Sequence, residues 1–209
     1  MSPQPDLNDL VAATITRMSQ LSAARDTAVN TSRQVVRFSA NAIRALHRGD
    51  DPGMMLEDAR RLLDLVAAET KPYPNVYWAG YVQDAMKEYA EAVITQAMLG
   101  NGTIPSAEQI GVEDTAWLNG LAEAASELRR DTLDALRGDD IERAELLLTT
   151  MDQVYGLLVT IDFPDSITGG LRRTTDQFRA VLERTRGDVT MSVRQSRLEH
   201  ALRNAEADI

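Results

Sequence analysis

The stretch W-L-N-G-L-A-E-A-A-S-E-L-R-R, residues 117–130, predicts the fold class. At about 100° per residue, a helix places its apolar positions on one stripe, which packs into a core. The apolar stripe of this stretch and its continuation comprises Leu118, Ala122, Ala125 and Leu136. The charged residues that lie opposite it are Glu123, Glu127, Arg130 and Asp134. This pattern is typical of an amphipathic helix.

The same helical period extends through the rest of the chain. No stretch alternates polar and apolar residues as a strand does, and glycine or proline separates the periodic segments. We therefore predict an all-α fold, a bundle of seven helices. The expected helices span residues 7–47, 53–69, 75–99, 113–137, 140–161, 168–186 and 188–205.

Length and composition suggest one compact domain spanning residues 1–209. Cysteine is absent, which excludes disulfides and thiolate metal sites. Residues 1–10 show no signal-peptide pattern, and no apolar run approaches membrane-spanning length. We expect a cytoplasmic protein that does not enter a membrane.

Carboxylates occur in pairs on two of the expected helices. The segment K-E-Y-A-E-A, residues 87–92, carries Glu88 and Glu91, and the opening stretch carries Glu123 and Glu127. Residues three or four apart share one helix face. If the two helices are neighbours, with antiparallel packing expected across their short connection, the four carboxylates can share a hard cation such as Mg²⁺ or Mn²⁺.

The alternative is that these carboxylates form ordinary solvated helix faces. Asp84, Glu88 and Glu91 argue against it, because they are like charges on one face with no cation to offset them. Such pairs destabilise a helix by roughly 0.2–0.5 kcal/mol each. A bound cation would remove that repulsion.

The net charge of −10 argues against a generally basic nucleic-acid binder. Acidic residues in excess and twenty arginines against two lysines resemble the proteins of salt-loving archaea. Nucleic acid would then be bound by local patches, since arginine suits phosphate recognition. One candidate patch is Arg33, Arg37, Arg44 and Arg48, at 4-7-4 spacing, and residues 168–203 form the most basic region. An ordinary charged surface is the alternative for both.

Several segments together resemble the translin family, and its translin-associated factor X branch in particular. These are S-R-Q-V-V-R-F-S-A-N-A-I-R-A-L-H-R at 32–48, residues 87–92, residues 117–130, M-D-Q-V-Y at 151–155 and R-G at 186–187. Each is weak alone, but their order and spacing are specific. No E-x-x-H pair, Walker A loop or G-x-S-x-G motif points to another family.

The resemblance implies a seven-helix α-superhelix that assembles into a closed, hollow homo-oligomer, commonly an octamer, with nucleic acid inside. The factor X branch is a Mg²⁺-dependent endoribonuclease that acts on single-stranded RNA. Its carboxylate motifs match Glu88 with Glu91 and Glu123 with Glu127 as catalytic metal ligands. Arg130 adjoins the second motif and joins the candidate nucleic-acid contacts. At Glu123 this chain departs from the family, which usually has the shorter Asp there.

A rival hypothesis is a non-catalytic protein that binds single-stranded DNA or RNA, as translin itself mostly does. Both carboxylate pairs are retained here, and pure binding gains nothing from negative charge that faces phosphate. A structural oligomer with solvated acidic faces is the third possibility.

Overall fold

Nine helices and no strand make up the part of the chain that this computed structural model describes, residues 6–100 and 102–207. The predicted all-α class is confirmed, with nine helices in place of seven. Six helices are long: α1 Leu7–Leu46, α2 Gly53–Thr70, α4 Gly80–Leu99, α6 Asp114–Arg137, α7 Ile141–Leu158 and α9 Leu171–Ala207. Three are single turns: α3 Pro74–Tyr77, α5 Ala107–Ile110 and α8 Asp165–Thr168.

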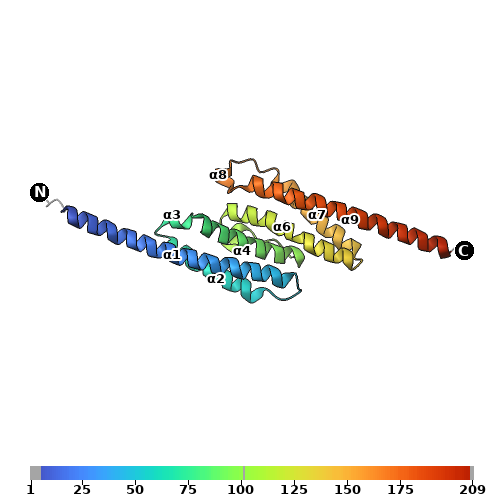
Figure 1. Cartoon of the computed structure of the whole chain (residues 1–209), viewed down its shortest axis with the longest axis horizontal. Coiled ribbons are helices and arrows are strands. Elements are labelled where there is room, and N and C mark those ends of the chain that lie inside the picture. Colours follow the sequence, from blue (N-terminus) through green and yellow to red (C-terminus); the bar gives the residue numbers. More distant parts are fainter. Residues whose placement is uncertain (1–5, 101, 208–209) are drawn as a thin grey trace.

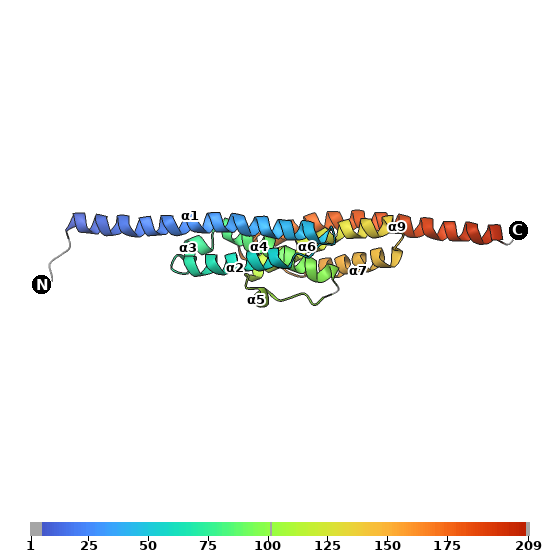
Figure 2. The same cartoon turned by 90° about the horizontal axis from the view of Figure 1, so that it is seen from below.

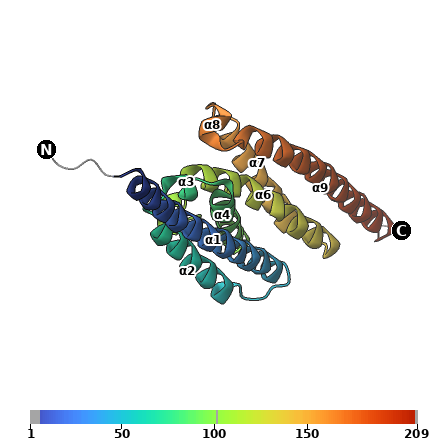
Figure 3. The ribbon, with the colours of Figure 1, turned by 60° about the vertical axis from the view of Figure 1, so that its left-hand side comes forward.

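The long helices run along one common direction (Figure 1). In Figure 2, α1 and α9 lie along one side of the molecule, whereas α2, α5 and α7 lie along the other. The turned view in Figure 3 places α4 and α6 between the α1–α2 pair and α9. The first part of α1 and the last part of α9 project from opposite ends of the body (Figure 1).

The core is centred on α4, which packs against α1, α2 and α6. Val82, Met86 and Ile94 are fully or almost fully buried, on more than one side of this helix. Helix α6 carries small, fully buried side chains, including Ala122 and Ala125, which let neighbouring helices approach closely. A helix enclosed in this way cannot present a broad solvated face, so some of its polar residues must be buried too.

The two carboxylate-bearing helices are parallel, and the expected antiparallel arrangement is wrong. The Tyr77 hydroxyl donates to Glu113 and the Lys87 ammonium donates to Glu123, so both contacts join residues 36 apart. The return is possible because residues 102–113, largely outside regular helix, run back along α4 (Figure 2). The Trp117 indole holds this connection by donating to the Pro105 carbonyl at 2.9 Å.

The expected helix over residues 75–99 is divided into α3 and α4. Ala79 between them has an extended backbone, with φ −69° and ψ 144°. The Tyr77 carbonyl accepts a hydrogen bond from the Gln83 amide, and the Tyr77 hydroxyl donates to the Glu113 carboxylate at 2.6 Å. Side-chain bonds therefore compensate for the backbone bonds that are lost where the helix restarts.

The expected break at residues 186–187 does not occur, and α9 passes through Gly187 without interruption. The Arg129 guanidinium of α6 holds both sides of this position. It donates to the Thr185 hydroxyl at 3.0 Å and lies 2.8 Å from the Asp188 carboxylate. Val189 beyond it is buried. An interior glycine weakens a helix by roughly 0.5–1 kcal/mol, which these tertiary contacts outweigh.

Among the described residues, none of the helices has the length and apolar character needed to span a membrane.

Replacing Gly187 by alanine should stabilise the protein by about 0.5–1 kcal/mol, because alanine favours a helix interior. A Cβ at this position would meet nothing within 4 Å. Urea unfolding followed by circular dichroism measures the change. Gly170→Ala is the matched control and should destabilise, since Gly170 has a φ of +84°. Destabilisation by Gly187→Ala would show instead that the helix ends there.

Candidate metal centre

Three of the four predicted carboxylates converge where α4 lies against α6. Glu88, Glu91 and Glu123 each offer an oxygen, and these oxygens all lie within 4.8 Å of one another. An all-oxygen set of this kind suits Mg²⁺ or Mn²⁺, which prefer carboxylate and water ligands. The donor set therefore fits a hard divalent cation.

The convergence depends on a close approach of the two helix backbones at Gly120. A Cβ at this residue would lie 2.9 Å from the Ala90 Cβ, the Glu91 amide nitrogen and the Lys87 carbonyl oxygen. Only a residue without a side chain allows this contact. Gly120 is not among the predicted site residues, although an interior glycine in a helical pattern indicates a packing reason.

Glu91 is the most deeply placed of the three carboxylates, with 8% of its surface exposed. Burial, together with the nearby charges of Glu123, Glu88 and Glu127, raises the pKa of Glu91 to about 9, and the Lys87 charge lowers it only in part. Two mechanisms thus act in one direction, since burial and like charge both disfavour the ionised form. A perturbed carboxyl beside two others is typical of functional sites.

The Lys87 ammonium partly neutralises the cluster. Its Nζ lies 2.8 Å from the Glu123 carboxylate and 3.3 Å from that of Glu88. Burial alone lowers the pKa of Lys87, but its hydrogen bond to Glu123 and the charges of Glu123 and Glu88 outweigh burial and raise the pKa. The expectation that no cation offsets this face was therefore wrong. Lys87 is one of only two lysines, which is the signal that could have revealed it.

Glu127 is not part of the three-carboxylate group. Its Oε2 lies 2.6 Å from Nε2 of His47, whose Nδ1 lies 2.9 Å from Oδ2 of Asp131. The His47 ring is almost completely buried, so both carboxylates are fixed by one side chain of α1's C-terminal end. The charge of Glu127 still contributes to the raised pKa of Glu91. Glu127 therefore lies beside the cluster, turned toward His47.

The candidate nucleic-acid arginines all lie on the surface. Arg37 lies over the Phe38 ring at 5.6 Å, the Arg44 guanidinium donates to the Asn41 amide oxygen, and Arg48 pairs with Asp50. Arg33 and Arg130 have no hydrogen-bond or ion-pair partner among the described residues. The structure thus leaves these side chains accessible without bringing them to the carboxylates.

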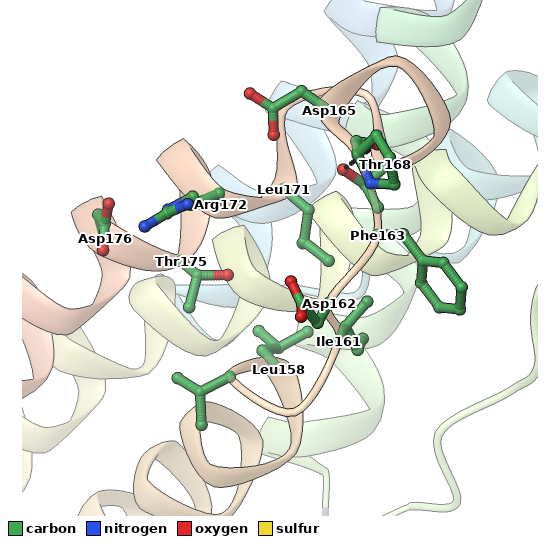
Figure 4. Close-up of a pocket in the computed structure, with 12 residues that line it drawn as sticks. Leu158, Ile161, Asp162, Phe163, Asp165, Thr168, Leu171, Arg172, Thr175 and Asp176 are labelled. Atoms are coloured by element: carbon green, nitrogen blue, oxygen red, sulfur yellow. Dashed lines mark hydrogen bonds between the residues drawn. The ribbon is translucent and has the colours of Figure 1, made fainter.

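A cavity of about 780 Å³ lies away from the carboxylates. It lies between the end of α7 and the start of α9. In Figure 4, Leu158, Leu171 and Thr175 line its interior, and Arg172 and Asp176 lie together at one side. None of the predicted metal ligands borders it, so cavity size does not locate the candidate metal centre.

Comparison with known structures identifies the fold family. The chain is 33% identical to AfC3PO, whose crystal structure superposes with a TM-score of 0.80 over 90% of this chain and 98% of that chain. The chain belongs to the C3PO/translin family. AfC3PO in complex with duplex RNA gives a TM-score of 0.80 at 32% identity, with the same coverage.

Two more distant proteins are also similar to this chain. Apo-NeC3PO is 23% identical, with a TM-score of 0.78 over 92% of this chain and all of that chain. The uncharacterised protein MJ0175 of Methanocaldococcus jannaschii is 24% identical over 193 residues, 92% of this chain and 86% of that protein. No protein-family model matches the sequence.

Gly120→Ala should destabilise the protein by about 1–3 kcal/mol, because the new methyl group must push α4 and α6 apart. Thermal or urea unfolding measures this effect. Gly156→Ala in α7 is the control, since nothing lies within 4 Å of the added Cβ and the variant should be as stable as wild type or more so. Equal behaviour of the two variants would contradict the close contact.

Glu91→Gln should stabilise the metal-free protein increasingly as the pH rises above 4.5. The unfolded chain ionises Glu91 near pH 4.5, whereas the folded protein keeps the proton until about pH 9. The wild type therefore loses stability across this window, at up to about 1.4 kcal/mol per pH unit, and the uncharged amide does not. Unfolding in EDTA at pH 5 and pH 8 measures the difference, with exposed Glu69→Gln as control. Parallel pH profiles for wild type and Glu91→Gln would contradict it.

Proposed function

We propose that this protein is a divalent-cation-dependent endoribonuclease of the factor X type. The observation that carries the proposal is the convergence of Glu88, Glu91 and Glu123 on one point between α4 and α6. A relative of 32% identity has been solved with duplex RNA, which supports nucleic acid as the ligand. Mg²⁺ or Mn²⁺ would be held by these three carboxylates, with Glu127 beside them.

The chain's own residues supply position and charge at this site. When bound, the cation supplies Lewis acidity toward a phosphodiester and makes water more acidic. Glu91 lies at the base of the cluster and is fixed by burial, whereas Glu88 and Glu123 are more exposed. His47 orients Glu127 at the edge. A carboxylate held beside the cluster is suited to accept a proton from water.

The contacts of Lys87 are compatible both with an endoribonuclease and with a protein that only binds nucleic acid. Its ammonium contacts Glu88 and Glu123, the same carboxylates that a cation would use. In the enzyme, Lys87 would compete with the cation for these oxygens. In a protein that only binds single-stranded DNA or RNA, Lys87 itself would neutralise the cluster permanently. Metal dependence of RNA cleavage separates the two functions.

We also propose that the chain works as a closed, hollow homo-oligomer. Apolar side chains are exposed along the projecting part of α1, where Leu10, Ile15 and Met18 are each at least half exposed. Leu198 and Leu202 are similarly exposed on the projecting part of α9. Exposed apolar stripes of this kind are typical of surfaces that contact other proteins. Light scattering that returned a monomer in both low and high salt would contradict assembly.

The decisive experiment is cleavage of labelled RNA by purified protein with Mg²⁺, with Mn²⁺ or with EDTA. Glu91→Gln should lower the rate by more than about 100-fold, because losing a direct ligand is more severe than losing one that supports a ligand. RNA binding should persist or tighten, since a negative charge near phosphate is removed. Both single-stranded and duplex RNA should be offered.

Exposed Glu69→Gln is the matched control and should cleave at the wild-type rate. Glu123→Asp tests the longer side chain at this position and should preserve or increase activity, because the shorter carboxylate is the usual residue in the family. Wild-type protein that binds RNA but never cleaves it would favour the rival binding function. Cleavage by Glu91→Gln at the wild-type rate would show that the cation is held elsewhere.

A further inference from the structure

A second, smaller pocket adjoins the carboxylate cluster. Its volume is about 310 Å³, and it shares Lys87 and Glu123 with the cluster. Helices α4 and α6 form two of its walls. The third wall is Gly169 and Gly170 with the first turns of α9. The pocket therefore continues from the candidate metal centre toward the basic C-terminal region.

One wall of this pocket is rigid. The Asn119 amide nitrogen donates to the carbonyls of Thr115 and Thr168, at 2.8 and 2.9 Å, and its oxygen accepts from the Thr174 hydroxyl at 2.7 Å. Asn119 is buried, and its bonds to Thr168 and Thr174 join α6 to both α8 and α9. The shape of the pocket is thus set by the fold.

Three further polar side chains of the pocket have no partner among the described residues. Arg173, Gln177 and Asp84 line it, and none of them makes a hydrogen bond or ion pair with another described residue. Arg173 is notable because Arg129, also from the α6–α9 interface, is fully engaged by Thr185 and Asp188. The pocket therefore presents one uncommitted guanidinium beside the cluster.

Unpaired charges of opposite sign lie on different sides of the pocket. Glu123 at one end is paired with Lys87, whereas Arg173 is a free cation on the α9 side. Asp84 is an exposed anion on the α4 side. A guanidinium binds phosphate in a bidentate manner, and a carboxylate accepts from a ribose hydroxyl. The volume lies at the lower end of small-molecule sites, as suits one nucleotide.

We infer that this pocket binds the nucleotide next to the scissile phosphodiester, with Arg173 on its phosphate and Asp84 on its ribose. The inference rests on the proposed endoribonuclease function and adds the substrate subsite to it. It assigns the recognition of one neighbouring phosphate to the start of α9. Cleavage takes place at the carboxylate cluster, and the pocket determines which phosphodiester of the RNA lies there.

Binding of a fluorescent five-nucleotide single-stranded RNA in EDTA tests the subsite without requiring catalysis. Arg173→Gln should weaken binding about tenfold and reduce the slope of log affinity against log salt by about 0.7, as expected for one lost phosphate contact. Arg179→Gln is the matched control, since Arg179 is exposed on the same helix and does not line the pocket. It should bind as wild type does.

Kinetics with Mg²⁺ give a second measurement. Arg173→Gln should raise KM about tenfold with little change in kcat, because a flanking phosphate is bound equally in ground and transition states. Asp84→Asn should weaken RNA binding more than binding of the matching DNA, which lacks the 2′-hydroxyl. A change confined to kcat would overturn the assignment of Arg173 to substrate binding.

The two proposals fail in different ways. If Arg173→Gln and Arg179→Gln both match wild type in affinity and salt slope, the subsite is refuted, even where RNA is cleaved. If the wild type never cleaves RNA with either metal, the endoribonuclease proposal is refuted. Arg173-dependent binding would then still support the pocket as a nucleotide site.

Discussion

The site depends on the contact between the backbones of α4 and α6 at Gly120. With a separation that leaves no room for a Cβ, carboxylates from both helices must share a small volume. The parallel register places the pair on α4 level with the pair on α6, because residues 36 apart face each other. Either a wider spacing or an antiparallel arrangement would separate the pairs. The close contact at Gly120 and the parallel register of α4 and α6 thus bring two ordinary helical carboxylate motifs together in one candidate metal centre.

Bringing carboxylates together creates an electrostatic problem that the fold solves in two ways. Lys87 pairs with Glu123 and Glu88, and His47 lies between Glu127 and Asp131. Glu91 receives neither partner, and its pKa is raised to about 9 mainly by burial. The remaining repulsion is a reason for the metal-free protein to favour a divalent cation. The same carboxylate cluster therefore destabilises the metal-free protein and favours the binding of a divalent cation.

Helix α6 connects this centre to the rest of the molecule. On one side it contacts α4 through Gly120, and on the other it fixes α9 through Asn119 and Arg129. Asn119 is bonded to α8 and α9, and one helical turn separates it from Glu123. The nucleotide pocket and the carboxylates are therefore built on the same rigid element. A site on packed helices keeps its geometry better than one on loops.

The sequence by itself determined the features that depend on local spacing. Helical periodicity predicted the all-α class, and the i,i+3 and i,i+4 positions predicted which carboxylates share a face. Only the tertiary structure decided that α4 and α6 are parallel, that Glu91 is buried, that Glu127 pairs with His47 and that α9 continues past Gly187. The physical reason is range. Helix faces follow from residues a few positions apart, whereas register, burial and ion pairing depend on which distant segments meet.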